Sequence, residues 1–278
     1  MTDKPFGTSG VCVATIGQGT WDVPERGAAS KEATRAIRRG IDLGMTHIDT
    51  AEMYGSGRVE EFLGTALEGV ERERLFVTTK VLPSNASYRG TLDAADRSLR
   101  RLRMDYVDVY LLHWPAEDPL EETMRAMARL VADGKARFVG VSNFDVPEML
   151  EAASHLDGIP LACNQVLYHL RERTVERRVI PAARERGIAI VGYTPFGRGS
   201  LPHSNVLDGV ATKHAATVRQ VILAFLTRFE NTFAIPKASQ IAHVEENAGA
   251  GDVRLDDDDI AAIDAAFPAG DARRLPTL

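Results

Sequence analysis

The feature that most constrains this fold is an alternation between short apolar runs and longer segments with helical periodicity, repeated through the 278 residues. Short apolar runs bounded by turn residues are typical of buried parallel strands, and apolar residues three or four positions apart are typical of helices that cover a sheet. The pattern predicts eight strands, at residues 16–19, 47–49, 75–80, 107–113, 138–142, 162–166, 189–193 and 233–236.

Segments with helical periodicity separate these strands. The first, residues 31–43, has Ala33, Ile37 and Ile41 on one face, with Ser30 as the predicted N-cap and Gly44 just past the end. The other predicted helices span residues 58–67, 88–102, 120–133, 146–155, 175–186 and 215–229. Eight strands that alternate with helices predict an α/β fold, a closed (β/α)8 TIM barrel.

Two further segments lie outside this repeat. Residues 4–15 are predicted to form an N-terminal hairpin that plugs the barrel floor, and residues 256–267 an extra C-terminal helix. The acidic run at 256–259 would cap that helix, because negative charge is favourable at an amino end. No Pro/Gly/Ser linker and no shift in composition interrupts the chain, so we expect a single domain over residues 1–278.

An open doubly wound sheet is the main alternative architecture. Such a sheet normally carries a G-x-G-x-x-G turn after its first strand, where a dinucleotide binds. Residues 17–22 and 55–60 each have the first two glycines of that motif, but an acidic residue replaces the third. The sequence therefore favours the barrel.

Charge and composition exclude several classes of partner. Lys and Arg total 33 against 39 Asp and Glu, the net charge is -6, and no basic run could track a nucleic-acid backbone. The N-terminus lacks the pattern of a signal peptide and no stretch approaches about 20 apolar residues, so we expect a cytoplasmic monomer without membrane contact. Cys12 and Cys163 lie in apolar segments far apart, and both are expected to be reduced core thiols.

Polar residues stand where three neighbouring strands end. Asp49 ends the second strand, Lys80 the third and His113 the fourth, and Tyr54 lies in the loop five residues after Asp49. Each has an ordinary alternative role, as a turn cap, a rim lysine, a core histidine or a loop aromatic. The carboxyl ends of barrel strands nevertheless meet at one rim, where active sites form.

Together these four residues form a chemical set. A phenol must give up a proton although its unperturbed pKa is about 10. An ammonium beside it, here Lys80, would lower the pKa of Tyr54, and Asp49 would keep Lys80 charged and oriented. Tyr54 is then the candidate general acid and His113 the guide for the substrate oxygen. We expect no catalytic metal, since the seven histidines show neither H-E-x-x-H nor H-x-H spacing.

The ordered set of motifs resembles the aldo-keto reductase superfamily over nearly the whole chain. The motifs that resemble the family are GTW at 19–21, DTAEMYG at 49–55, Lys80, HWP at 113–115, SNF at 142–144, NQ at 164–165 and IPK at 235–237. The strings GQGTW, IDTAEMY, LLHW and NQVLYHL are similar to a bacterial subgroup associated with methylglyoxal reduction. The resemblance implies reduction of small aldehydes, α-dicarbonyls or ketones by hydride transfer from NADP(H).

The resemblance also implies positions for the cofactor. Ser142, Asn143 and Gln165 would hold the carboxamide, and Tyr193 would stack on the nicotinamide. The remaining implied contacts are Gly19, Thr20, Trp21, Asp49, Thr194, Phe196, Arg198, Pro236, Lys237, Ser239, His243, Glu246 and Asn247.

Two of these residues bear on cofactor choice. Lys237 supplies a positive charge suited to the 2′-phosphate of NADP(H). At His243 the family pattern has arginine, and a neutral imidazole cannot reproduce a guanidinium fork on phosphate. We expect NADP(H) to be preferred, with weakened discrimination against NAD(H).

Aromatic residues are expected to wall the substrate site. Trp21 and Trp114 would flank Tyr54 and His113, with barrel-rim packing as their alternative role. Met53, Asn85 and Tyr168 are further candidates for the lining, at a greater distance. The cluster Arg97, Arg100, Arg101 and Arg103 is expected to form a solvated helical face.

Two other functions are compatible with parts of this pattern. One is a cofactor-sensing accessory subunit, because related barrels serve ion channels; the intact set of four catalytic candidates argues against it. The other is a metal-assisted hydrolase that uses strand-end Asp, Lys and His residues in an unrelated barrel.

Overall fold

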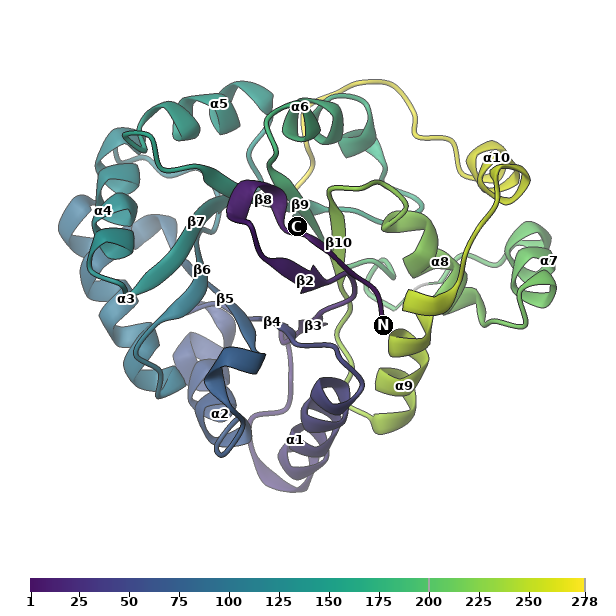
Figure 1. The fold of residues 1–278 in the computed structure, drawn as a ribbon, viewed down its shortest axis with the longest axis horizontal. Helices are drawn as coiled ribbons and strands as arrows, with labels where there is room; N and C mark the ends of the chain where they lie inside the picture. Colours follow the sequence, from purple (N-terminus) through teal and green to yellow (C-terminus); the bar gives the residue numbers. More distant parts are fainter. Residues whose placement is uncertain (200, 278) are drawn as a thin grey trace.

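A computed structural model describes residues 1–199 and 201–277, and within them eight parallel strands form a barrel surrounded by helices (Figure 1). The strands are β3 (Gln18–Gly19), β4 (His47–Asp49), β5 (Phe76–Val81), β6 (Val107–Leu112), β7 (Ala136–Ser142), β8 (Leu161–Leu167), β9 (Ala189–Tyr193) and β10 (Thr232–Ile235). Each pairs with its neighbour in chain order. The predicted (β/α)8 barrel is confirmed.

The barrel closes between its first and last strands. Parallel bridges join Ile16 to Ala234 and Gly19 to Lys237. A Cβ atom at Gly19 would lie 2.6 Å from the backbone oxygen of Ile235, so only glycine allows the two strands to approach this closely.

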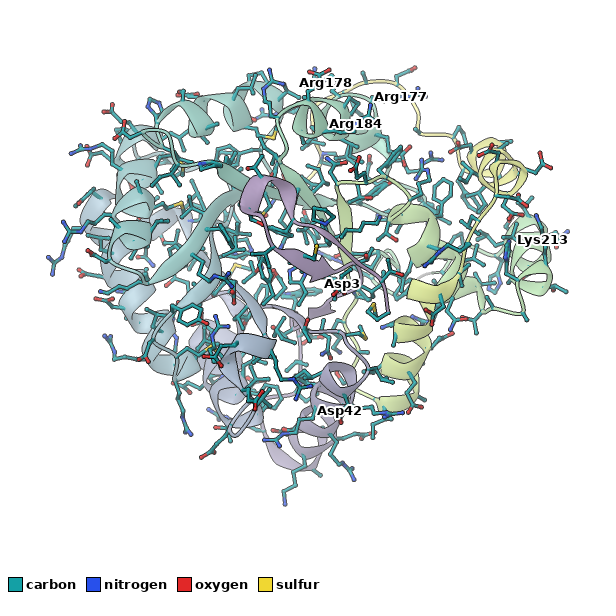
Figure 2. All side chains as sticks on the ribbon, in the orientation of Figure 1. Asp3, Asp42, Arg177, Arg178, Arg184 and Lys213 are labelled. Carbon is teal, nitrogen blue, oxygen red and sulfur yellow. The ribbon has the colours of Figure 1, made fainter. Side chains whose placement is uncertain are left out.

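Helices cover the outside of the barrel. They are α1 (Gly27–Asp42), α2 (Arg58–Ala66), α3 (Tyr88–Leu102), α4 (Leu120–Ala132), α5 (Val146–Ser154), α6 (Val179–Glu185), α7 (Asn205–Lys213), α8 (Val218–Leu226), α9 (Ile241–Gly249) and α10 (Asp257–Ala266). Figure 2 shows charged side chains on this outer surface, for example Asp42 on α1 and Lys213 on α7. None of the helices in the described ranges is long and apolar enough to cross a bilayer.

Some predicted helix boundaries are wrong. Ser30 is not the N-cap of α1, because the helix already begins at Gly27 and Ala28 and Ala29 are strong helix formers that extend it. Gly44 does follow the helix, with a left-handed φ of 89°. The predicted helix 175–186 is divided into a 3-10 turn, η5 (Thr174–Glu176), and α6.

Two helices were not predicted at all. One is α7, in a stretch between β9 and β10 that has little periodicity, and the other is α9, in the stretch that was assigned only cofactor contacts. Helix α8 was predicted, but it covers only the middle of the predicted range 215–229. The predicted C-terminal helix is confirmed as α10, where Asp256 and Asp259 form a capping box.

The N-terminal hairpin closes the floor of the barrel. Strands β1 (Asp3–Pro5) and β2 (Cys12–Ala14) pair antiparallel, as predicted. Phe6, between them, is fully buried, with its ring centroid 4.8 Å from that of Phe76 and 5.1 Å from that of Phe233. Cys12 is exposed, contrary to the prediction of a core thiol, because the alternation of the strand turns Val13 inward instead.

The arginine cluster on and after α3 is not uniformly solvated. Arg101 is 20% exposed, and its Nε lies 2.6 Å from Oε2 of the fully buried Glu60. Glu60 also accepts a 2.6 Å hydrogen bond from Thr79 in β5. The prediction of a solvated face is therefore wrong for Arg101, which balances a buried carboxylate between the helices and the sheet.

Candidate active site

Lys80 is the centre of the candidate site. Its Nζ lies 2.7 Å from Oδ1 of Asp49 and 3.2 Å from the phenolic oxygen of Tyr54, and it donates to the backbone oxygen of Thr50 at 2.8 Å. The Lys80 side chain is fully buried. A buried ammonium is tolerated only with close partners, so these three acceptors fix its position.

Strand register explains how these groups meet. Asp49 of β4 pairs with Thr78 of β5, and Lys80 lies two positions further along, on the same face of the strand. Tyr54 begins the 3-10 turn η2 (Tyr54–Gly57), in which Gly55 and Gly57 have left-handed φ values of 56° and 91°. This tight turn returns the phenol to the rim above Lys80.

The charges within this group follow from burial and pairing. Burial, the largest single effect, lowers the pKa of Lys80, but Asp49 and Tyr54 together outweigh it and raise the pKa above its ordinary value of 10.5. Burial raises the pKa of Tyr54, and Lys80 only opposes that rise. The expectation of a lowered Tyr54 pKa is therefore wrong in net direction, since a buried phenolate loses more hydration than the ammonium restores. A protonated Tyr54 beside a charged Lys80 can donate a proton.

His113 follows β6 and faces the same phenol. Its ring centroid lies 5.9 Å from that of Tyr54 at an interplanar angle of 72°, and its Nδ1 is buried without a hydrogen-bond partner among the described residues. Burial and the charge of Lys80 lower the pKa of His113 to about 2. The imidazole is therefore neutral and can hydrogen-bond to a polar substrate.

A second polar group joins the site from the opposite side of the barrel. The side-chain amide of Gln165, in β8, donates to Oδ2 of Asp49 at 2.6 Å. Ser142 donates through Oγ to the backbone oxygen of Gln165, and Asn143 donates to the backbone oxygen of His113. Tyr193 donates to Oδ1 of Asn143 at 2.8 Å. The four residues predicted to hold the nicotinamide end thus form one connected cluster.

The bond between Gln165 and Asp49 was missed by sequence reasoning. The sequence shows that Gln165 follows Asn164 near the end of a predicted strand, and it was assigned only to the cofactor. No sequence spacing could link the amide of Gln165 to a carboxylate on a different strand.

The loop after β9 reaches across the rim. Thr194 and Arg198 have left-handed φ values of 56° and 59°. The guanidinium of Arg198 lies 5.4 Å from the ring centroid of Trp21, which is 49% exposed. Thr20, beside Trp21, donates from its hydroxyl to the backbone oxygen of Asp49 at 2.8 Å. The GTW segment and this loop are therefore in contact above the site, while Phe196 is buried beneath Arg219.

The stretch from Pro236 to Asn247 carries the residues assigned to the adenosine end. Lys237 is exposed, and His243 is half exposed with Nδ1 3.5 Å from Oε2 of Glu246. Ser239 Oγ and Asn247 Oδ1 are buried without hydrogen-bond partners among the described residues. The Lys237 ammonium suits a phosphate and the Ser239 hydroxyl can donate to one, whereas Asn247 Oδ1 can only accept, as from the amino group of an adenine; together the three groups fit a nucleotide.

A cleft opens beside His113. It has a volume of about 400 Å³ and is lined by Trp114, Pro115, Asn143, Asp145, Glu148, Arg274, Leu275 and Thr277. The Trp114 ring centroid lies 4.6 Å from that of His113, which connects the cleft to the candidate catalytic group. The contribution of residues 274–277 was not predicted.

Tyr168, Asn85 and Met53, the more distant candidates for the substrate lining, differ in exposure and in their contacts. Tyr168 is fully buried and donates to Glu176 at 2.5 Å, so it lies behind the lining, in keeping with the greater distance expected for it. Asn85 donates to Glu52 at 2.9 Å and steadies the loop below Tyr54. Met53 is 37% exposed on that loop.

Comparison with known proteins gives consistent matches. The Aldo/keto reductase family model matches residues 15–267. Methylglyoxal reductase YeaE of Escherichia coli (strain K12) is 41% identical over 275 residues, which cover 97% of this chain and 96% of that protein. Glyoxal reductase of Bacillus subtilis (strain 168) is 36% identical over 259 residues, covering 92% of this chain and 90% of that protein.

A solved structure agrees over the full length. It is an aldo-keto reductase from Klebsiella pneumoniae in complex with NADPH, with a TM-score of 0.91 and 38% sequence identity. The match covers 100% of both chains.

Proposed function

The chain belongs to the aldo/keto reductase family, and from this premise we propose that it reduces small aldehydes, α-dicarbonyls or ketones to alcohols with Tyr54 as the general acid. The observation that carries the proposal is the position of Lys80 Nζ between Asp49 and the phenolic oxygen of Tyr54. This arrangement keeps a buried ammonium next to a proton donor at the rim of the barrel.

The proton transfer is assigned to the residues at the rim. Tyr54 gives its proton to the carbonyl oxygen as that oxygen gains negative charge, and the ammonium of Lys80 stabilises the phenolate left behind. Asp49 orients Lys80, and neutral His113 donates a hydrogen bond that guides the oxygen toward Tyr54. When bound, the reduced nicotinamide would supply the hydride for the carbonyl carbon.

The residues present fit NADP(H). Ser142, Asn143 and Gln165 would hold the carboxamide, with Tyr193 as the stacking ring. The unsatisfied atoms of Ser239 and Asn247 lie in the segment proposed for the adenosine end, with Lys237 for the 2′-phosphate. The similar Klebsiella protein is solved with NADPH, which supports NADP(H) as the preferred cofactor. Use of NAD(H) with weaker discrimination remains our proposal from His243.

Methylglyoxal and glyoxal are the substrate types that the named relatives suggest. We propose that Trp21 and Trp114 wall the opening above Tyr54 and His113. No contact among the described residues favours the cofactor-sensing accessory subunit. We further propose that the chain acts as one domain, as a cytoplasmic monomer, which light scattering of the purified protein would test.

A substrate panel with both reduced cofactors tests the function. The purified protein should consume NADPH on addition of methylglyoxal, and the absorbance of NADPH should fall in proportion to the alcohol formed. No loss of absorbance with a broad set of aldehydes and ketones would contradict carbonyl reduction.

A further inference from the structure

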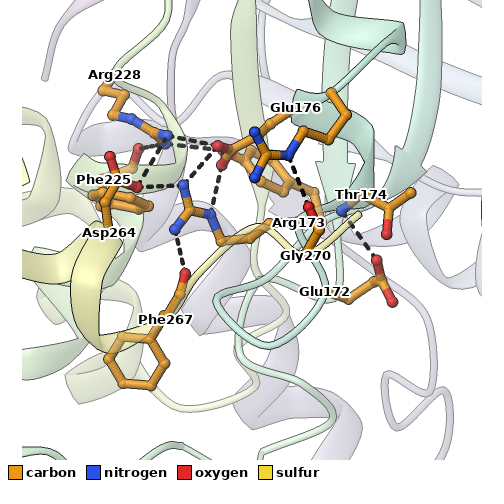
Figure 3. Close-up of polar contacts among 11 residues, drawn as sticks. Glu172, Arg173, Thr174, Glu176, Phe225, Arg228, Asp264, Phe267 and Gly270 are labelled. Carbon is orange, nitrogen blue, oxygen red and sulfur yellow. Dashed lines mark hydrogen bonds and ion pairs between the residues drawn. The ribbon is translucent and has the colours of Figure 1, made fainter. Parts of the chain in front are cut away.

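A cluster of charged residues lies under the loop that follows β8 (Figure 3). Arg173, which is 4% exposed, donates from Nε to Glu176 at 2.9 Å and pairs with its second oxygen at 2.6 Å. Arg228, two residues after the end of α8, lies 2.8 Å from the same carboxylate and donates to Tyr168 at 3.0 Å. These contacts hold the connection between β8 and α6 against α8.

The same guanidinium also holds the end of the chain. Arg173 pairs with Asp264, in the last turn of α10, and donates to the backbone oxygen of Phe267 just after it. Figure 3 shows this side chain between Glu176 on one side and Asp264 and Phe267 on the other. One buried arginine therefore joins α10 to the loop after β8.

Further contacts continue this attachment toward the C-terminus. Arg177 donates to the backbone oxygen of Gly270 at 2.8 Å, and Arg273 pairs with Glu172 at 2.6 Å. Residues 268–277 contain no helix or strand, and side chains from 172–177 supply polar anchors at Gly270 and Arg273.

This anchored segment ends at the cleft beside His113. Arg274, Leu275 and Thr277 line the cleft opposite Trp114 and Pro115. Leu275 also packs against the hydrophobic core, and Arg274 lies 3.5 Å from Glu148. The apolar wall of the cleft thus depends on a segment that is fixed through Arg173 and its neighbours.

We propose that Arg173 is a positioning residue that sets this wall, and that the wall favours carbonyl compounds whose second substituent is an apolar or aryl group. The proposal rests on the function proposed above. A methyl substituent stays near Tyr54 and His113, whereas a phenyl ring extends into the cleft and contacts Trp114 and Leu275. Three charged residues line the cleft, and each is paired: Asp145 with Arg178, and Glu148 with Arg274. The cleft therefore has no unpaired charge for an ionic substituent among the described residues.

Two full-length variants separate this role from general stability. Arg273→Met removes the exposed anchor to Glu172, and Arg173→Met removes the buried one. Arg125→Met is the matched control, because Arg125 is exposed on α4 and its contacts, with Glu122 and the ring of Tyr88, do not involve residues 268–277. Methylglyoxal and phenylglyoxal serve as paired substrates that differ only in a methyl against a phenyl group.

The measurements are hydrogen exchange of residues 268–277 and steady-state kinetics with NADPH. We expect faster exchange in both anchor variants and a rise of about tenfold in KM for phenylglyoxal, because the phenyl ring loses its apolar contact. The KM for methylglyoxal, the KM for NADPH and kcat for both aldehydes should stay within about twofold of the parent. The control should match the parent throughout.

Other results overturn the proposal. They are exchange that stays unchanged in both variants, faster exchange without a change in the ratio of the two KM values, or an equal rise for both aldehydes. The last would indicate a general loss of structure, and Arg273→Met decides the matter if Arg173→Met does not fold. If the parent protein reduces neither aldehyde, the proposed function is contradicted. The proposed preference for apolar or aryl substituents is then overturned as well.

Discussion

The side-chain amide of Gln165 donates a 2.6 Å hydrogen bond to Asp49, which lies 116 positions earlier in the chain. The other carboxylate oxygen of Asp49 accepts from Lys80 at 2.7 Å. One buried carboxylate therefore connects the strand proposed to hold the cofactor with the ammonium that faces Tyr54, the proposed proton donor. The proposed cofactor contact and the proposed acid thus share Asp49 as an anchor.

Replacing Tyr54 with Phe tests the proton donor directly. We expect kcat with methylglyoxal to fall by about 10²–10⁴-fold, because general acid catalysis typically contributes that much. The urea midpoint and the NADPH dissociation constant, measured by fluorescence, should remain close to the parent values. Near-normal turnover would reject the role of Tyr54.

Replacing Lys80 with Met should destabilise the fold. Asp49 would then be a buried charge without its cation, which costs about 3–5 kcal/mol of unfolding free energy. The double variant Asp49→Asn with Lys80→Met should recover part of that loss, because no uncompensated charge remains. Urea unfolding of the three proteins measures both effects, and equal stability of the single and double variants would contradict the ion pair.

Stability should fall steeply in mild acid because of two buried histidines. Burial lowers the pKa of His47 to about 3 and that of His113 to about 2, against 6.5 for the ordinary residue. Below pH 6.5 the unfolded chain binds protons that the folded chain does not, so the stability present above that pH is lost toward pH 3. Each histidine contributes a slope of about 1.4 kcal/mol per pH unit.

Urea unfolding between pH 5 and 7 checks this dependence. His47→Leu should remove one histidine's share of the slope, since both ring nitrogens of His47 are buried without partners among the described residues. His203→Leu is the control, because the His203 side chain is exposed. The same slope in both variants would show that His47 does not carry the effect.

Cofactor discrimination should depend on two exposed residues. His243→Arg should raise the preference for NADPH over NADH by about tenfold, since a guanidinium binds phosphate through charge-assisted bonds. Lys237→Met should lower it by a similar factor. The readout is the ratio of kcat/KM with the two cofactors, and Arg89→Met, an exposed change on α3, is the control. A parent preference of several thousandfold would contradict the relaxed discrimination proposed from His243.

The convergence of Asp49, Lys80 and His113 could be predicted because it depends on topology. Each lies at the end of a buried strand or one residue from it, and parallel barrel strands end at one rim. The net pKa direction of Tyr54 could not, because it depends on how far burial outweighs the ammonium. That balance is set by atoms around the phenol rather than by residue order.

Features that depend on tertiary packing were also beyond the sequence. Helices α7 and α9 pack against α8, and α9 also packs against α1, so their stability depends on tertiary contacts rather than on local propensity. Leu275 gives no local signal of its place beside Trp114, because its anchors lie about 100 positions earlier. The exposure of Cys12 likewise depends on which face of a short hairpin meets the barrel.

The position of Phe6 gives the two ends of the barrel different roles, one in stability and one in binding. Because its ring packs on Phe76 and Phe233 and closes the amino-terminal end of the barrel, the carboxyl-terminal rim, where Asp49 and His113 lie, is left as the end for binding and chemistry. Substitutions in the loops at the carboxyl-terminal rim can therefore alter which compounds bind, while the hairpin around Phe6 keeps the barrel folded.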